Sequence, residues 1–220
     1  MFISHNHKCI FIHIPKAAGS SVHRTLTNTL LISKADRPRG HYKLTMHRLK
    51  PYINEYFTFC FVRNPWSRFI SAYNYLLPWI VKGEKGDSEK QRFYDKFISP
   101  YIHLSDRRDH FKCFNDFILG NNSTGKIHTK LLKQQHFIPQ YKYILDSNNN
   151  INIDFIGRFE NLHKDFDIIC KKIGIKTPKL RHLNSRPHDQ YQLYYTDETA
   201  EIIYNAYKED IDYFDYSFNF

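Results

Sequence analysis

The sequence predicts an α/β fold in which helices flank a mostly parallel β-sheet. Short apolar runs at residues 9–14, 56–62 and 153–157 have the length and composition of buried strands. Each run is followed by a segment whose apolar residues recur at helical spacing. Strands that alternate with helices are typical of a parallel sheet covered on both faces. Ligands of such sheets bind beyond the carboxyl ends of the strands.

Length and composition predict one folded domain over residues 1–220. With 41% hydrophobic and 16% aromatic residues, the chain can bury a substantial core and does not have the composition of a disordered protein. The net charge of +10 favours a polyanionic partner, such as a nucleotide, a nucleic acid, an acidic glycan or a membrane surface. A generally basic soluble protein has the same charge, so charge alone does not choose a partner.

The cysteines and histidines give no pattern of a disulfide framework or a metal site. The 4 cysteines lie far apart, and we expect reduced thiols. His5 and His7 are potential metal ligands, but a solvated terminus is the simpler interpretation. No apolar run approaches the roughly 18 residues that span a bilayer, and the first residues lack the apolar core of a secretory signal. We therefore expect a cytoplasmic protein, at most peripheral to a membrane, without a metal.

The segments after the first two strands predict helices. Residues 20–32 carry Val22 and Leu26 four positions apart, on one helical face. The stretch "NPWSRFISAYNYLLPWI" directly follows the second strand, and its apolar residues also share one face. There Asn64 is a natural N-cap, and Pro65 suits the first helical position.

The rest of the chain predicts further helices. Residues 92–119 and 127–137 have helical patterns in pieces. A helix over 161–174 ends at Gly174, a typical C-terminal stop. The last helix, 197–211, has acidic residues in its first turn, and the aromatic tail after it is expected to pack on the body of the protein.

The loop "PKAAGSS" between the first strand and the first helix is a candidate anion site. Such a turn directs several backbone N–H groups and a helix N-terminus at one point, while Ser20 and Ser21 add hydroxyls and Lys16 adds a charge. An ordinary strand-to-helix turn has the same features. No lysine follows Gly19, and no acidic residue ends the first two strands, so metal-dependent ATP or GTP hydrolysis is disfavoured.

A second candidate anion site follows the second strand. Arg63 ends that strand, and Ser71 lies two turns into the next helix. A fixed guanidinium suits bidentate recognition of phosphate. The alternatives are a structural salt bridge for Arg63 and a tolerated helix-face hydroxyl for Ser71.

These motifs together resemble a known family. "HIPKAAGSS" resembles the 5′-phosphosulfate loop of sulfotransferases that use 3′-phosphoadenylyl sulfate (PAPS), and "FVRNPWSRFISAY" resembles their 3′-phosphate motif. "FIGRFENL" and residues 184–218 resemble later segments of the carbohydrate branch, which includes the heparan 2-O- and chondroitin/dermatan enzymes and compact bacterial relatives. "HFIPQY", 136–141, also looks family-like, without an assigned role. The resemblance runs nearly end to end and implies a P-loop-like three-layer sandwich.

The resemblance also implies which residues bind PAPS. Lys16 stands beside the oxygen that bridges phosphate and sulfur, where negative charge grows during transfer, so it is a catalytic candidate as well. Arg63 and Ser71 hold the 3′-phosphate, a basic loop with Arg186 closes over it, and no metal is required. Where many relatives carry threonine, this chain lacks a side-chain donor. The implied cofactor-binding residues are Lys16, Ala17, Ala18, Gly19, Ser20, Ser21, Arg63, Ser71 and Arg186.

A base must take the proton of the acceptor hydroxyl, and a neutral histidine suits this near pH 7. His41, in "RGHYKLT", resembles the glycine–histidine of the heparan 2-O-sulfating enzymes. An ordinary surface histidine is the alternative interpretation, with His47 and then Glu55 as substitutes for the base. His13 lies in the first strand and is expected to be structural, whereas His23 lies near the phosphates and fits either role. Arg158 either reaches the nucleotide or forms a structural ion pair with Glu160.

The favoured function is a PAPS-dependent sulfotransferase that acts on a hydroxyl of a saccharide, polysaccharide or glycolipid. The alternatives are a P-loop-type nucleotide kinase, another nucleotide-binding enzyme, or a nucleic-acid-binding module. The last is disfavoured because most aromatic residues fall at core spacing rather than in basic runs. Residues 78–150 are expected to build the acceptor pocket, and the sequence leaves the acceptor and the oligomeric state open.

Overall fold

The computed structural model describes two compact units. The sheet unit comprises Met1–Arg63 and Pro139–Arg186, and the helical unit comprises Asn64–Ile138 and Pro187–Phe220. Each unit combines two separate stretches of the chain. A single folded domain over residues 1–220 therefore stays a prediction. The structure describes residues 1–37, 51–82, 110–119, 127, 131–145, 150–151, 153–180 and 190–218.

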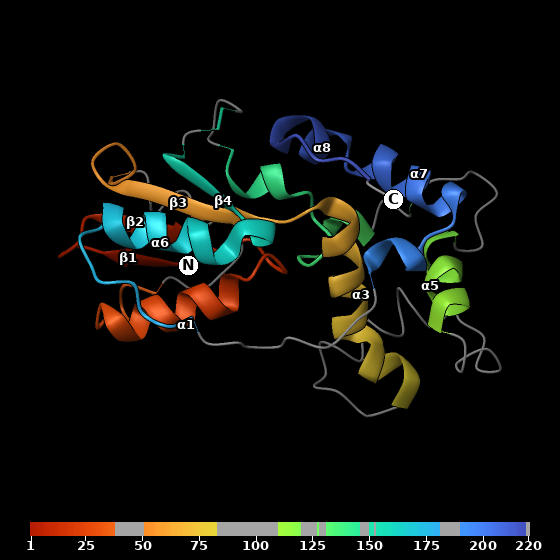
Figure 1. The fold of residues 1–220 in the computed structure, drawn as a ribbon, viewed down its shortest axis with the longest axis horizontal. Helices are drawn as coiled ribbons and strands as arrows, with labels where there is room; N and C mark the ends of the chain where they lie inside the picture. Colours follow the sequence, from red (N-terminus) through yellow and green to blue (C-terminus); the bar gives the residue numbers. More distant parts are fainter. Residues whose placement is uncertain are drawn as a thin grey trace. The chain divides into compact units, whose positions relative to one another are not determined.

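The sheet unit contains a four-stranded sheet in the order β1-β2-β3-β4 (Figure 1). The strands are β1 (Phe2–Ser4), β2 (Cys9–Ile12), β3 (Phe57–Val62) and β4 (Phe155–Arg158). β1 pairs antiparallel with β2, whereas β2–β3 and β3–β4 are parallel. The mostly parallel sheet of an α/β protein is therefore confirmed.

Strand β1 was not predicted from the sequence. Residues 2–4 are buried and pair with β2, whereas His5, Asn6 and Lys8 in the following turn are exposed. The ring centroid of Phe2 lies 5.6 Å from that of Phe11 and 6.3 Å from that of Phe59, in the apolar core of the unit. A three-residue edge strand is too short to show an alternating pattern, so its pairing with β2 becomes visible only in the fold.

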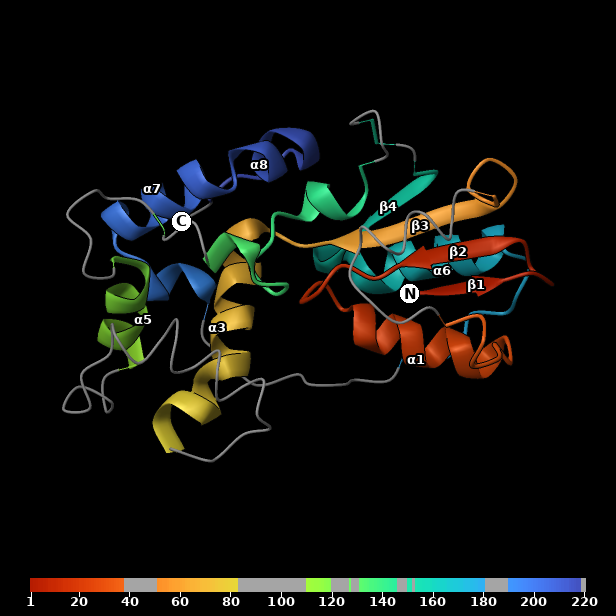
Figure 2. The ribbon, with the colours of Figure 1, turned by 180° about the vertical axis from the view of Figure 1, so that it is seen from behind.

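Among the described residues, two helices accompany this sheet. Helix α1 (Gly19–Thr29) connects β2 to the chain that leads to β3, and α6 (Leu162–Lys172) follows β4. α6 lies in front of the strands in Figure 1 and behind them in Figure 2, so it covers one face of the sheet. Gly174 has φ 75°, which confirms the predicted left-handed glycine stop after α6.

In the described residues, the helical unit contains α3 (Pro65–Lys82), α5 (His110–Leu119), α7 (Asp197–Ala206) and α8 (Lys208–Phe214), with short 3₁₀ turns. Asn64 caps α3 as predicted: its Oδ1 accepts hydrogen bonds from the backbone N–H groups of Trp66 at 3.1 Å and Ser67 at 3.3 Å. None of the helices in the described stretches combines the length and apolar character needed to cross a bilayer.

Two helix predictions in this unit were wrong. The single helix over 197–211 is two helices, α7 and α8, that meet at Tyr207, where φ is −123°. The Tyr207 hydroxyl donates to the Phe137 carbonyl oxygen at 2.7 Å in the buried interior, a nonlocal contact that local spacing does not report. Of 127–137, only Leu131–Lys133 forms a short 3₁₀ helix among the described residues. The predicted helical pieces before residue 110 lie outside the described residues.

The aromatic tail packs on the helical unit, as predicted. The ring centroid of Phe218 lies 5.2 Å from Trp66, 5.9 Å from Tyr191 and 5.7 Å from Tyr195. The indole Nε1 of Trp66 in turn donates to the Ala200 carbonyl oxygen at 2.9 Å. The tail thus packs on the start of α3 and on the segment that precedes α7, against the core of this unit.

Candidate functional site

The loop between β2 and α1 holds an unusual backbone. Lys16 has φ 70° and Ala18 has φ 60°, in the left-handed region that residues with a side chain rarely adopt. Ala17, between them, is fully buried. Left-handed residues that alternate with other conformations turn successive backbone N–H groups toward one side, which makes a concavity for an anion. Such strain costs roughly 1–3 kcal/mol per residue and is typical of ligand-binding segments.

The N-terminus of α1 adds donors at the end of this loop. Ala18 is the N-cap residue and makes no side-chain cap. Its carbonyl oxygen accepts from the backbone N–H groups of Ser21 at 3.0 Å and Val22 at 3.2 Å. Within the described residues, the N–H groups of Gly19 and Ser20 have no acceptor. Uncapped N–H groups at a helix N-terminus favour a bound anion.

Gly19 is required by a close approach. A Cβ atom at this position would overlap Cδ2 and Nε2 of the His13 imidazole. The His13 ring is stacked with Phe11 at 6.0 Å and with His23 at 6.4 Å between centroids. The His13 ring therefore packs against Gly19, the first residue of α1, as expected for a structural histidine.

His23 lies on the far side of this stack. Its Nε2 is 3.1 Å from the Met1 carbonyl oxygen, and burial lowers the pKa of its imidazole to about 4. The ring is therefore neutral at pH 7. Since Nε2 is engaged by a main-chain oxygen, the packing interpretation of His23 accounts for its position.

Arg63 lies against the loop between β2 and α1. It directly follows β3 and is 5% exposed. Its guanidinium carbon is 4.0 Å from the centroid of the Phe159 ring, within the range of a cation–π contact. Its Nη1 is 3.5 Å from the Lys16 carbonyl oxygen. The structure thus brings the two predicted anion-binding motifs, that of Lys16 and that of Arg63, to one rim of the sheet.

Gln140 holds the main chain of Arg63. The Gln140 side chain is fully buried, at the start of the 3₁₀ helix Gln140–Tyr143. Its Oε1 accepts from the Arg63 N–H at 2.9 Å, and its Nε2 donates to the Arg63 carbonyl oxygen at 2.8 Å. Sequence reasoning noticed the surrounding segment, 136–141, but gave it no role, and only the fold reveals the contact.

The other predicted site residues are placed as follows. Arg158 ends β4 beside Val62, at the same rim, and its backbone N–H donates to Asp165 Oδ2 at 2.7 Å. Ser71 is half-buried on α3, in the helical unit. Glu55 is exposed and precedes β3, at the opposite end of that strand from Arg63. His41, His47 and Arg186 lie outside the described residues.

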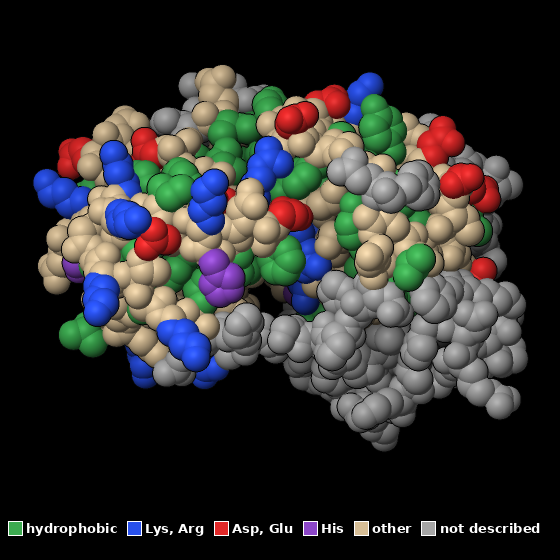
Figure 3. Space-filling model, in the orientation of Figure 1, with side chains coloured by type: hydrophobic (Ala, Val, Ile, Leu, Met, Phe, Trp, Pro, Cys, Tyr) green, Lys and Arg blue, Asp and Glu red, His purple; other side chains and the backbone are tan. Residues whose placement is uncertain are grey.

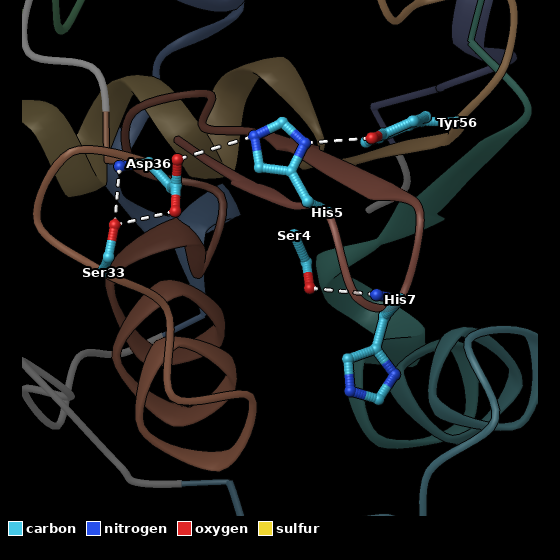
Figure 4. A network of polar contacts seen from close by, with 6 residues as sticks. All are labelled: Ser4, His5, His7, Ser33, Asp36 and Tyr56. Atoms are coloured by element: carbon cyan, nitrogen blue, oxygen red, sulfur yellow. Dashed lines mark hydrogen bonds and ion pairs between the residues drawn. The ribbon is translucent and has the colours of Figure 1, made fainter.

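A separate polar network occupies the opposite end of the sheet (Figure 4). His5, in the turn between β1 and β2, has Nδ1 2.9 Å from the Tyr56 hydroxyl and Nε2 3.5 Å from Asp36 Oδ1. The Ser33 hydroxyl donates to the other oxygen of Asp36 at 2.7 Å. His5 thus joins the turn to two segments that are distant in the sequence. The described part of the chain contains no group of three or more metal-ligating side chains.

The basic residues do not mark one patch on the face of the sheet unit that Figure 3 shows. Lys and Arg side chains are spread over it, with Asp and Glu among them. On this face, the charge of +10 therefore does not point to one polyanion-binding surface. The site is defined by the loop and Arg63 rather than by bulk charge.

The curated relatives of the chain include two carbohydrate sulfotransferases of Danio rerio. Carbohydrate sulfotransferase 10 is 25% identical over 98% of this chain and 66% of the relative, and carbohydrate sulfotransferase 14 is 25% identical over 79% and 48%. An uncharacterised protein of Archaeoglobus fulgidus is 28% identical over 65% of this chain and 88% of the relative. The match thus spans about two thirds and about half of the two named relatives.

A family model gives the broader relationship. No solved structure matches the chain. The model described as the sulfotransferase family matches residues 1–217, nearly the whole sequence. With the loop at Lys16 and Arg63 in place at one sheet rim, the chain belongs to the sulfotransferase family.

Proposed function

We propose that the protein transfers a sulfuryl group from PAPS to a hydroxyl of a carbohydrate acceptor. The observation that carries this proposal is the contact of Arg63 with the Lys16 carbonyl oxygen, which joins the two candidate anion-binding motifs at one rim. Membership of the sulfotransferase family supports the same activity and disfavours a nucleotide kinase.

The 5′-phosphosulfate is proposed to bind the loop 16–21. The left-handed backbone at Lys16 and Ala18 and the N–H groups of Gly19 and Ser20 support this assignment. Because the loop carries alanine at 17 and 18, main-chain N–H groups and serine hydroxyls supply most of its donors.

The 3′-phosphate is proposed to bind Arg63, with Ser71 and Arg186 as further ligands. The support for Arg63 is its fixed position: its guanidinium is packed on Phe159 beside the loop. A fixed guanidinium offers paired donors to phosphate oxygens. Recognition of this phosphate would distinguish adenosine 3′,5′-bisphosphate (PAP), the product of transfer, from AMP and ADP.

The chemistry is a direct displacement. PAPS supplies the activated sulfuryl group; the acceptor oxygen forms a bond to sulfur while the bond from sulfur to the bridging phosphate oxygen breaks. Lys16 is proposed to stabilise the negative charge that grows on that oxygen. His41 is proposed to take the hydroxyl proton, with His47 as the alternative base. Cationic side chains do the electrostatic work, so the proposed reaction uses no metal.

The acceptor is proposed to be a saccharide, polysaccharide or glycolipid. Two of the relatives are named carbohydrate sulfotransferases, which supports this class. The net charge of +10 is compatible with an anionic glycan, because opposite charge steers association.

The direct test is transfer of radioactive sulfate from sulfur-35-labelled PAPS to a panel of glycans in the presence of EDTA. We expect a labelled glycan from the wild-type protein. The His41→Ala variant should lose transfer while its PAP affinity stays near wild type, and His47→Ala serves as the comparison. Magnesium-dependent turnover of ATP without any sulfate transfer would contradict the proposal.

A further inference from the structure

We propose that Gln140 is the positioning residue that aims Arg63 at the 3′-phosphate of the nucleotide. This inference rests on the proposed function, because it assigns Arg63 to that phosphate. It also gives a role to the segment 136–141, which the proposed chemistry does not use.

The first step concerns the end of strand β3. Its pairing with β2 ends at Cys60, and its pairing with β4 ends at Val62. Arg63 therefore lies one residue beyond the ladder. The Gln140 side-chain amide hydrogen-bonds the main chain of this residue: its Oε1 accepts from the Arg63 N–H at 2.9 Å, and its Nε2 donates to the Arg63 carbonyl oxygen at 2.8 Å. One side chain thus replaces a neighbouring strand and satisfies both polar groups of a buried peptide segment.

The second step connects this main-chain clamp to the guanidinium. Arg63 is 5% exposed and Gln140 is 0% exposed. Both side chains are therefore held in place by the packing around them. With its backbone fixed, the Arg63 side chain reaches the Phe159 ring at 4.0 Å and the Lys16 carbonyl oxygen at 3.5 Å. A guanidinium that is already placed loses less conformational freedom when phosphate binds, so its contacts contribute more to affinity.

The third step asks why the residue is a glutamine. An uncharged amide side chain offers a donor and an acceptor in one plane, as the two groups of Arg63 require. A glutamate at pH 7 keeps the acceptor and loses the donor. The backbone at Gln140 is also constrained, because the residue before it is a proline. Pro139 is the N-cap of the 3₁₀ helix, with φ −50° and ψ 141°.

The test compares PAP with AMP, two nucleotides that differ only in the 3′-phosphate. The measured quantity is the ratio of their dissociation constants, obtained by calorimetry for the wild type, Gln140→Met, Gln140→Glu and Arg63→Ala. Gln134→Met is the matched control: its amide accepts from the His136 N–H at 2.7 Å and contacts His136 Nδ1 at 3.1 Å, and neither contact involves Arg63.

We expect Gln140→Met to reduce the preference for PAP about tenfold, the size of one charge-assisted hydrogen bond, while AMP affinity stays within about twofold. Gln140→Glu, which keeps one of the two hydrogen bonds, should lose less. Gln140→Met should add little to Arg63→Ala in the double variant, because both remove the same interaction. Gln134→Met should leave the preference unchanged.

The outcomes separate this inference from the proposed function. If the wild type shows no preference for PAP, the proposed function itself fails. If Arg63→Ala loses the preference but both folded Gln140 variants keep it, Gln140 is structural only and the inference is overturned. Should Gln140→Met not fold, the ratio for Gln140→Glu decides alone: an unchanged ratio contradicts the inference, and a reduced one supports it.

Discussion

At the residue scale, the candidate site uses a backbone that residue types do not suggest. Local propensity would give the left-handed conformation of the loop to Gly19, yet Lys16 and Ala18 adopt it instead. Gly19 begins α1, and its missing Cβ makes room for the His13 ring. The sequence could place a candidate anion site in this loop. It could not show that Lys16 and Ala18 adopt the left-handed conformation while Gly19 makes room for His13, because the His13 contact depends on the packed fold.

Replacing Gly19 with alanine tests that contact. The new Cβ would overlap the His13 imidazole, so we expect Gly19→Ala to lower the free energy of unfolding by about 1–3 kcal/mol. PAP affinity should fall as well, since the ring and the helix N-terminus must move apart. Urea unfolding and calorimetry measure the two effects.

Gly174→Ala is the matched control for this substitution. No atom lies within 4 Å of its added Cβ, and only the φ of 75° is unfavourable. It should cost about 1–2 kcal/mol of stability and leave PAP affinity unchanged. A Gly19→Ala protein with wild-type stability and wild-type affinity would refute the close approach.

Lys16 is expected to serve transition-state stabilisation more than binding. Lys16→Ala should reduce kcat about 100-fold or more, the usual cost of one lost charge-stabilising group, with a much smaller change in PAP affinity. Lys8→Ala is a matched control, because Lys8 is another left-handed lysine (φ 43°) but lies in the turn between β1 and β2. A collapse of PAP binding at unchanged kcat would make Lys16 a clamp rather than a catalyst.

At the element scale, long patterns with caps were predictable and short or interrupted ones were not. The strands β2 and β3 and the helices α1, α3 and α6 follow from apolar spacing and from signals such as Asn64 and Gly174. The short strand β1 and the break at Tyr207 depend on pairing and on a buried hydrogen bond. Tertiary contacts of that kind leave no periodic trace in the sequence.

The cap of α3 is an element-scale prediction. Asn64→Ala removes the acceptor of the Trp66 and Ser67 N–H groups and also the Nδ2 donor to the Ser217 carbonyl oxygen at 3.0 Å. We expect the free energy of unfolding to fall by about 1–2 kcal/mol in urea. The stability of Asn64→Asp, which keeps the cap acceptor and loses the Nδ2 donor, should lie between that of the wild type and that of Asn64→Ala. Equal stability of all three proteins would rule out a stabilising cap.

At the scale of the whole molecule, the sequence correctly indicated the family and the approach of the loop at Lys16 to the strand end at Arg63. Parallel strands bring their carboxyl ends together, so the loop at Lys16 and the strand end at Arg63 had to be neighbours. The contribution of Gln140 was beyond sequence reasoning, because it joins residues 77 positions apart. The base stays a prediction, since His41 and His47 lie outside the described residues.

The state of the thiols is a prediction for the whole protein. Cys9, Cys60 and Cys170 are free and buried, in agreement with the expected reduced state. Burial raises the pKa of Cys9 to about 12 and that of Cys170 to about 11, and it raises the pKa of Cys60 as well. Only the thiolate reacts, so these three thiols should resist Ellman's reagent at pH 8.

The same titration in urea supplies the control. All 4 cysteines should react once the chain is unfolded. Rapid reaction of all of them in the native protein would show that the described cysteines are accessible, against their buried positions.

The central claim is that Arg63 and the Lys16 loop seat opposite ends of one doubly phosphorylated nucleotide. The most direct measurement is the shift in melting temperature that PAP and ADP cause in the wild type, in Arg63→Ala and in Arg24→Ala, which changes an exposed arginine on α1. We predict that PAP, but not ADP, stabilises the wild type and Arg24→Ala, and that Arg63→Ala loses most of this stabilisation. An equal shift by PAP in the Arg63→Ala protein would contradict the account.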